Sequence, residues 1–346
     1  MSGVEWKPDI LGNGYRQHVL DLGSDPDREG DVEAVLVRRE QLLDQPGADQ
    51  PRAADAERGV VLYVHGFSDY FFQTDVADFF AARAFRFYAL DLRKCGRARR
   101  PGQTAHFVSD LALYDAELDR ALDIVTAAHP GLPVLLVAHS TGGLVVPLWL
   151  DRRRAAGTGG AVVGAVLNSP WLDLQGSPLL RGPVTQLLRV LGKAQPYRVI
   201  PARPGVYGRT LHVSATGEWE FDTELKPLNG FPVTCGWLNA IRRGHASLHR
   251  GIEAGVPVLV LRSSRSDLGG QYSPDSDRAD LVLDTAQIAR WGGSLGSQVT
   301  DAPIEDARHD VFLSVSEARQ RAYATLEAWL TGAVGVPVGG SGSSKP

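Results

Sequence analysis

The sequence predicts an α/β protein with a mostly parallel sheet and helices on both faces. Short apolar runs, typical of buried strands, alternate with longer stretches in which apolar residues have helical spacing. At the centre of this alternation, the apolar run 134–137 precedes Ser140, and Gly142 and an apolar helix over 144–150 follow at once. A serine in a tight turn between a buried strand and a helix is typical of a nucleophile elbow. At 346 residues the chain can form one large α/β domain or two smaller ones.

The N-terminal part of the chain predicts an antiparallel start to the sheet. Residues 15–22 and 32–39 have strand patterns and are separated by a turn-rich segment. Residues 44–58 are rich in Asp, Pro and Ala, and we expect an exposed loop there. The next predicted elements are a buried strand at 59–64, a helix at 74–84, a strand at 85–92 and an amphipathic helix at 110–128.

After the elbow, a strand is predicted at 161–167, and the regular alternation then stops. Residues 171–255 contain seven prolines and a helical stretch at 237–252. An irregular insertion between two sheet strands is the usual position of a lid over an active site, so we expect a lid, with a structural excursion at one sheet edge as the alternative. Five aromatic residues of this insertion are candidates to line an apolar pocket: Trp171, Trp219, Phe221, Phe231 and Trp237.

The alternation resumes with a strand at 256–261 and a polar insertion at 263–278. The remaining predicted elements are a helix through 287–291, a strand at 298–304 and an amphipathic helix at 316–330, with His309 in a loop just beyond the strand. We therefore expect an N-terminal core part at 1–170, the lid at 171–255, a C-terminal core part at 256–333 and a flexible Gly- and Ser-rich tail at 334–346.

Composition argues against several classes of function. The net charge is −4 and the pI about 6.1, so no global field attracts nucleic acid or an anionic membrane. Cys95 and Cys235 are too few for a disulfide framework and fit a cytoplasmic protein. The N-terminus has no apolar signal segment and the chain has no long apolar run, so we expect no membrane insertion.

Three weaker signals have structural interpretations. The basic run 93–100 has no aromatic residues between its charges, and we expect a solvated loop. His245 and His249 are spaced as zinc ligands on a helix can be, but no third ligand is evident, so no metal or cofactor is expected. The glycines at 157–160 precede a strand, which indicates a turn and not a dinucleotide site.

Ser140 needs two partners to act as a nucleophile. A serine hydroxyl attacks only when a base removes its proton, and a carboxylate must hold that base in the right tautomer. On a sheet with such an elbow, the order along the chain is Ser, acid, His. His309 is the only histidine after His249, so by elimination it is the expected base.

Six segments carry a family resemblance: Leu-Tyr-Val-His-Gly at 62–66, Asp-Leu-Arg at 91–93 with Gly96, His-Ser-Thr-Gly at 139–142, Pro-Val-Leu-Val-Leu at 257–261, Ala-Asp at 279–280 and His-Asp at 309–310. With them the chain resembles, over about residues 15–330, α/β-hydrolases of the serine aminopeptidase and monoacylglycerol lipase type, the Hydrolase-4 or lysophospholipase-like group. The resemblance implies an α/β-hydrolase fold, with a mostly parallel eight-stranded sheet and a helical or loop lid inserted after strand 6.

The sequence departs from the family pattern at two places. The family's Asp-x-Arg-Gly-His-Gly-x-Ser stretch is Asp-Leu-Arg-Lys-Cys-Gly-Arg-Ala at 91–98, and Ala138 replaces the first glycine of the elbow. Neither change removes a catalytic group, but both make the inference of a substrate less direct.

The acid has several candidates. Asp280 resembles the family's acid loop and precedes His309 by 29 residues, whereas Asp267 precedes it by 42. The shorter gap leaves one helix and one strand between acid and base, so we favour Asp280 over Asp267. The other candidates are Asp275, Asp277 and Asp173.

The oxyanion hole is expected to consist of two backbone N–H groups, those of Phe67 and Thr141. His65 is expected either to support the Phe67 loop by hydrogen bonding or to be an ordinary strand-end histidine. His139 is expected to bond locally and not to act as a base.

These residues predict a serine hydrolase that acts through an acyl-enzyme. The resemblance to lipase-like members of the family implies that it cleaves carboxylic esters, with a small-molecule ester or lipid-like substrate. The resemblance leaves an aminopeptidase open, and that alternative needs acidic residues to bind an amine; the candidates are Glu218, Glu220, Asp222 and Glu224. A binding protein without turnover is a further alternative, because fold alone does not establish activity. Acyl transfer to an acceptor other than water is also open.

Overall fold

The structure, a computed structural model, describes residues 4–12, 14–40, 57–174, 190–201 and 205–335. Within these ranges the chain forms a nine-stranded sheet in the order β1-β2-β3-β5-β4-β6-β7-β8-β9. Its strands are β1 Lys7–Pro8, β2 Tyr15–Ser24, β3 Asp31–Arg39, β4 Gly59–Val64, β5 Phe85–Asp91, β6 Val134–His139, β7 Val162–Asn168, β8 Val258–Ser263 and β9 Val299–Ile304.

The sheet is mostly parallel, as predicted. The pairs from β1 to β5 are antiparallel, and every pair from β5 to β9 is parallel. The count differs by one from the predicted eight strands, because β1 adds a two-residue edge strand in which Lys7 pairs with Gln17 and Pro8 with Arg16. Two residues, one of them proline, carry no strand pattern, so the sequence gives no signal for β1.

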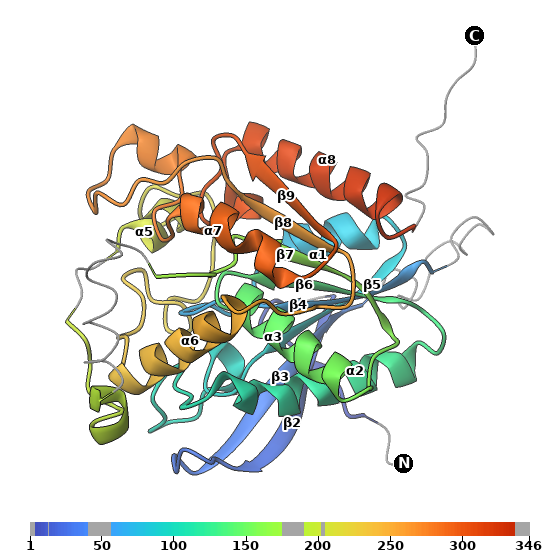
Figure 1. Cartoon of the computed structure of the whole chain (residues 1–346), viewed down its shortest axis with the longest axis horizontal. Coiled ribbons are helices and arrows are strands. Elements are labelled where there is room, and N and C mark those ends of the chain that lie inside the picture. The colour runs from blue at the N-terminus through green and yellow to red at the C-terminus, as the bar shows by residue number, and fades with distance from the viewer. Residues whose placement is uncertain (1–3, 13, 41–56, 175–189, 202–204, 336–346) are drawn as a thin grey trace.

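Helices cover both faces of the sheet (Figure 1). The α-helices labelled in Figure 1 are α1 Thr74–Ala81, α2 Asp115–Ala128, α3 Gly142–Ala155, α5 Tyr207–Leu211, α6 Cys235–Leu248, α7 Thr285–Gly292 and α8 Ser316–Gly332. Short 3₁₀ helices lie at η2 Gly96–Ala98, η3 Leu111–Tyr114, η4 Pro274–Arg278, η5 Gly293–Leu295 and η6 Val311–Leu313. The predicted helix at 110–128 therefore begins with a 3₁₀ turn, and Asp110 accepts the Ala112 N–H there at 3.0 Å.

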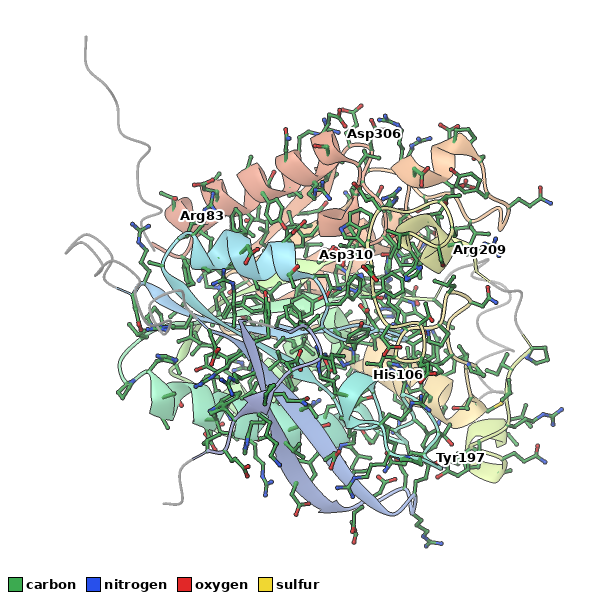
Figure 2. All side chains as sticks on the ribbon, turned by 180° about the vertical axis from the view of Figure 1, so that it is seen from behind. Arg83, His106, Tyr197, Arg209, Asp306 and Asp310 are labelled. Carbon is green, nitrogen blue, oxygen red and sulfur yellow. The ribbon has the colours of Figure 1, made fainter. Side chains whose placement is uncertain are left out.

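The central strands are buried on both faces, and their alternate residues enter two different cores. In β4, Val60 and Leu62 belong to the core that α2, α3 and α7 cover, whereas Val61 and Tyr63 belong to the core under α1 and α8. All six residues of β4 and of β6 are buried. This burial explains why both strands appear in the sequence as unbroken apolar runs. Figure 2 shows how densely side chains fill both layers.

The chain leaves the sheet after β7 and returns at β8, which pairs directly with β7. In the described parts of the predicted lid, residues 190–194 are helical, and α5 and α6 follow. Helix α6 begins two residues before the predicted helix and ends four residues earlier, close to the left-handed turn at Gly251. The role of 171–255 as a lid and the three boundaries between the four predicted segments stay predictions.

Two predicted segments, a loop and the C-terminal tail, lie mostly outside the described residues. These are the exposed loop at 44–58, of which only 57 and 58 are described, and the tail at 334–346, of which only 334 and 335 are described. No helix in the described ranges is long and apolar enough to cross a membrane.

The prediction of a solvated loop for the basic run 93–100 is wrong. The Lys94 side chain is 0% exposed and pairs with Asp25 and with Glu29, at 2.7 Å for the latter. Arg93 and Arg97 are also buried and paired, Arg93 with Glu117 and Arg97 with Asp9 and Asp91. The acidic partners come from distant segments, so the composition of the run alone did not reveal that its charges are neutralised inside the protein.

Candidate active site

Ser140 occupies the turn between β6 and α3. Its φ angle is +51°, a left-handed conformation that is strained for any residue with a side chain. The turn is held because Ser140 N–H donates to the Asn168 carbonyl at 2.9 Å and the Ser140 carbonyl accepts from Trp171 N–H at 3.0 Å. A strained serine fixed between a buried strand and a helix has the geometry of a nucleophile elbow.

The elbow needs glycine where the backbones approach. A Cβ on Gly142 would lie 2.6 Å from the His65 carbonyl oxygen, so no larger residue fits there without a shift. A Cβ on Gly66 would lie 2.9 Å from the Ser140 Cβ. Ala138, which replaces the first glycine of the motif, is fully buried in the core beneath α3.

His309 and Asp280 are hydrogen-bonded to each other. His309 Nδ1 lies 2.9 Å from Asp280 Oδ2, and both side chains are buried. Asp280 Oδ1 accepts the backbone N–H groups of Val282 at 2.8 Å and Leu283 at 2.7 Å, which fixes the carboxylate. Because an ionised carboxylate only accepts, Nδ1 carries the proton and Nε2 keeps a lone pair, the tautomer that a general base needs.

His309 lies beside the elbow. Its ring centre is 4.9 Å from that of His139, the residue before Ser140. The loop that carries His309 is tied to the end of β7, because Asn168 Nδ2 donates to Asp310 Oδ1 at 2.6 Å and Asn168 Oδ1 accepts from Val311 N–H at 3.1 Å. The structure therefore places the hydrogen-bonded His309–Asp280 pair beside the elbow that carries Ser140, although Ser140 is far from both in the sequence.

The other candidate acids point elsewhere. The carboxylate of Asp267 accepts from the nearby Gly269 N–H at 3.2 Å, and Asp275 pairs with Arg265 at 3.5 Å. Asp277 pairs with Arg308, and Asp173 is engaged with Trp291 and Arg242. Ser266 and Asp280 form an isolated β-bridge, so the chain between them is a loop that closes on itself, as expected for an insertion ahead of the acid.

The two expected oxyanion-hole residues line one cavity. Phe67 and Thr141 are among its walls, and the others are His65, Gly66, Leu92, Cys95, His106, Tyr114, Gly142 and Trp237. His65 supports the Phe67 loop: its Nε2 accepts from Leu92 N–H at 3.0 Å, so Nδ1 donates to the Gly66 carbonyl at 2.7 Å. The loop is thus fixed to the end of β5.

The five aromatic residues of the insertion do not share one pocket. Trp237 lines the cavity and packs on Phe67 with ring centres 4.1 Å apart, and Trp171 packs on Trp237 at 5.8 Å. Phe221 and Trp219 belong to a separate cluster around Leu211. Trp237 is therefore the member of the set that lines this cavity.

His106 is a cavity residue that the sequence analysis missed. Burial lowers the pKa of His106 well below its ordinary value, and the neighbouring His65 lowers it further, so the ring is neutral. Its Nδ1 lies 3.1 Å from Cys95 Sγ, and the residue is labelled within the protein in Figure 2. His106 lies in a loop that contains no recognisable motif, so the sequence does not indicate that it lines the cavity.

The two spaced histidines at the end of α6 contact backbone carbonyls. His245 Nε2 lies 2.9 Å from the Trp171 carbonyl and His249 Nε2 2.8 Å from the Leu172 carbonyl, so each donates to a carbonyl. Within the described residues, no group of three or more His, Cys, Asp or Glu side chains is placed to hold a metal ion.

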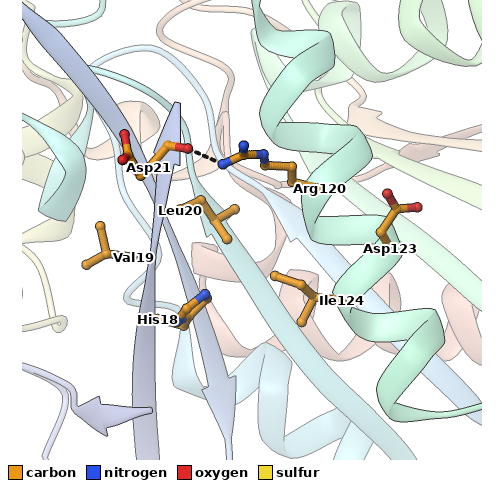
Figure 3. Close-up of a pocket in the computed structure, with 7 residues that line it drawn as sticks. All are labelled: His18, Val19, Leu20, Asp21, Arg120, Asp123 and Ile124. Carbon is orange, nitrogen blue, oxygen red and sulfur yellow. Dashed lines mark hydrogen bonds between the residues drawn. The ribbon is translucent and has the colours of Figure 1, made fainter. Parts of the chain in front are cut away.

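A second hollow lies at the antiparallel end of the sheet, between β2 and α2 (Figure 3). It is lined by His18, Val19, Leu20, Asp21, Arg120, Asp123 and Ile124. It contains none of the predicted site residues, whereas Phe67 and Thr141 line the cavity beside the elbow, so the candidate active site is the region of the elbow.

The sheet order and the elbow define an α/β-hydrolase fold, and comparison with known proteins gives the family. Residues 55–271 match the family described as serine aminopeptidase, S33 (Hydrolase_4). This range is more than half of the chain, so the protein belongs to that family.

A curated relative and several solved structures are similar to the chain. A monoacylglycerol lipase of Mycolicibacterium smegmatis is 31% identical over 142 residues, or 40% of this chain and 46% of that protein. The match therefore spans about half the length of that relative.

The solved structures share the fold at low sequence identity. A monoglyceride lipase of Saccharomyces cerevisiae superimposes with a TM-score of 0.58 at 14% identity, covering 95% of this chain and 94% of that one. A monoacylglycerol lipase of Paleococcus ferrophilus gives 0.55 at 20% identity, covering 81% and 96%. A carboxyl esterase of Bacillus coagulans gives 0.58 at 14% identity, covering 92% and 99%.

Proposed function

We propose that the protein is a serine hydrolase that cleaves carboxylic esters, with Ser140 as nucleophile, His309 as base and Asp280 as the orienting acid. The observation that carries the proposal is the Asp280–His309 hydrogen bond of 2.9 Å beside a strained serine elbow. Family membership supports a serine hydrolase, and the names of the relatives, which are lipases and an esterase, support an ester as the substrate.

The reaction begins when His309 Nε2 takes the proton of Ser140 Oγ as the oxygen attacks the ester carbonyl. The N–H groups of Phe67 and Thr141 then stabilise the negative charge on the carbonyl oxygen. When the tetrahedral intermediate collapses, His309 gives its proton to the leaving alcohol, and the acyl group remains on Ser140. Water, deprotonated by His309, attacks the acyl-enzyme in the same way and releases the acid.

We propose a small-molecule or lipid-like ester as the substrate class, because the relatives named above are lipases and an esterase. The surroundings of the elbow are apolar, since the walls of the cavity include the aromatic residues Phe67, Tyr114 and Trp237 together with Leu92. The cavity itself has a volume of about 10 Å³, room for about one water molecule, so it does not by itself hold an acyl chain.

The structure does not favour an aminopeptidase. The four acidic residues considered for amine binding, Glu218, Glu220, Asp222 and Glu224, are all exposed. Asp222 caps its own turn by accepting the Glu224 N–H at 2.8 Å, and Glu218 faces Arg319 at 3.8 Å. An exposed, locally satisfied carboxylate is a poor site for a buried substrate ammonium group.

Turnover of model substrates tests the proposal. Purified wild-type protein should hydrolyse short p-nitrophenyl esters faster than aminoacyl p-nitroanilides, and Ser140→Ala and His309→Ala should each abolish ester turnover. Ser264→Ala, on an exposed serine, is the matched control and should retain activity. Faster cleavage of the amides would favour the aminopeptidase, and no turnover of either class by folded wild type would favour a binding protein.

A further inference from the structure

A second Asp–His pair lies at the elbow. His139 Nδ1 is 3.2 Å from Asp69 Oδ2, and the Asp69 side chain is only 1% exposed. Asp69 belongs to the loop after β4, the same loop that carries Phe67. His139 immediately precedes Ser140, so this pair joins the nucleophile elbow to the oxyanion loop.

The inserted segment supplies the counter-charge. Lys226 Nζ donates to the other oxygen of Asp69, Oδ1, at 2.7 Å, and its side chain is 7% exposed. The ammonium group also lies over the rings of Phe72, at 5.5 Å, and Phe221, at 5.7 Å. The ion pair is therefore in an apolar environment, where charges interact more strongly than at a surface.

The protonation states in this network follow from its geometry. Burial alone would raise the pKa of Asp69, but the Lys226 charge and the hydrogen bond from His139 outweigh it and hold that pKa well below its ordinary value. Asp69 is thus an anion that only accepts, and His139 must donate through Nδ1. Among the described residues, His139 Nε2 is buried without a hydrogen-bond partner.

Neighbouring contacts fasten the same part of the insertion to the same loop. Phe231 N–H donates to Ser68 Oγ at 2.9 Å, and Asp222 N–H donates to Tyr70 OH at 2.8 Å. Residues on both sides of Lys226 therefore contact the residues on both sides of Asp69. Lys226 contributes the ionic bond at the centre of this contact.

We propose that Lys226 is a positioning residue for the reaction: through Asp69 it holds the His139 ring and the Phe67 loop in the arrangement that Ser140 needs. The inference rests on the proposed serine-hydrolase function. The insertion then does two things: it packs over the cavity, and it contributes a charge on which the geometry of the active site depends.

The physical reason is the cost of leaving Asp69 without its counter-ion. Removing one partner of a buried ion pair leaves an uncompensated charge, and the surroundings rearrange to solvate or neutralise it. The groups nearest to Asp69 for such a rearrangement are His139 and the loop with Phe67. Displacement of either moves the elbow or an oxyanion-hole donor, and a shift of about 1 Å in a reacting geometry lowers rates by about 100-fold.

The test is a double-mutant cycle on ester turnover. Lys226→Met removes the charge and keeps an unbranched side chain that is one atom shorter, and we expect kcat to fall about 10- to 100-fold with KM changed less than about threefold. The double variant Asp69→Asn with Lys226→Met also removes the carboxylate charge, while the amide oxygen of the introduced side chain can still accept from His139. We expect this variant to recover kcat to within about fivefold of wild type. Lys193→Met, an exposed lysine in the same segment, is the matched control.

Two results would overturn the proposal. One is a Lys226→Met variant with wild-type kcat. The other is a double variant that remains as slow as Lys226→Met, with KM raised in both, because that result means that the lysine only anchors the insertion over the cavity. Melting temperatures of all variants separate these outcomes from a loss of folding.

A spectroscopic readout tests the network without any turnover. In ¹⁵N-histidine-labelled Ser140→Ala, the His139 ring, assigned by His139→Gln, should show a protonated Nδ1 that donates to Asp69. Lys226→Met should change this signature and the added Asp69→Asn should restore it. If wild type proves inactive on esters, the proposed function fails, but the spectrum still tests the Lys226–Asp69–His139 arrangement. An unchanged His139 signal in Lys226→Met would refute that arrangement.

Discussion

Replacing Asp280 with asparagine separates the two main candidate acids with a minimal change of shape. Asp280 accepts three hydrogen bonds, from His309 Nδ1 through one oxygen and from the backbone N–H groups of Val282 and Leu283 through the other. An asparagine has one oxygen and one NH₂ group. In either orientation it places a donor against a donor.

The favoured orientation keeps the oxygen on the two backbone N–H groups and turns NH₂ toward His309. His309 must then accept at Nδ1 and carry its proton on Nε2, so it cannot remove the proton of Ser140. We expect kcat/KM for ester hydrolysis to fall about 10³- to 10⁴-fold, which corresponds to about 4–5 kcal/mol of lost transition-state stabilisation.

Steady-state hydrolysis of a p-nitrophenyl ester measures this effect, with Asp267→Asn as the control. The Asp267 carboxylate contacts only its own turn among the hydrogen bonds described, so its variant should stay within about twofold of wild type. The opposite pattern, an inactive Asp267→Asn and an active Asp280→Asn, would refute the assignment of the acid.

Two further predictions concern stability. Arg93 and Glu117 form a buried pair at 2.6 Å, so Arg93→Met should lower the free energy of unfolding by about 3–5 kcal/mol in urea titrations. Adding Glu117→Gln should recover part of that free energy. Equal stability of wild type and Arg93→Met would contradict this prediction. Burial lowers the pKa of His245 from 6.5 to about 3, so the folded state resists its protonation. The stability that the neutral His245 contributes is fully present above pH 6.5 and is lost as the pH falls toward 3. At pH 4.5 about 3 kcal/mol of the free energy of unfolding has been lost. The urea midpoint of wild type should therefore fall more steeply from pH 7 to pH 4.5 than that of His245→Phe, and parallel slopes would show that His245 does not contribute.

The parts of the fold that could be predicted from the sequence are those encoded locally. The buried runs that became β4 and β6, the serine between β6 and α3, and the spacing from Asp280 to His309 each lie within a short stretch of chain. A parallel sheet then brings the carboxyl ends of its strands to one edge, which explains why residues so far apart in sequence meet there.

The parts that could not be predicted depend on pairing between distant segments. Lys94 looked like a solvated charge, because its partners Asp25 and Glu29 belong to another part of the chain. Lys226 and Asp69 are 157 residues apart, and neither lies in a motif that marks a buried ion pair. Charge pairing inside a protein leaves no periodic pattern in the sequence, unlike strand and helix formation.

The aromatic residues of the insertion show the same limit. Composition predicted one apolar pocket, but Phe221 packs with Leu211 whereas Trp237 packs on Phe67. A set of aromatic residues indicates buried apolar surface, and the path of the backbone decides which of them share a cluster.

Labelling with a fluorophosphonate probe tests whether Ser140 is an activated nucleophile. The probe reacts only with a serine whose proton is removed during attack, so intact-mass spectrometry should show one adduct on wild type, located on the peptide that contains Ser140. Ser140→Ala and His309→Ala should remain unlabelled, and Ser264→Ala should label as fast as wild type. Labelling of His309→Ala at the wild-type rate, or an adduct on another serine, would contradict the account.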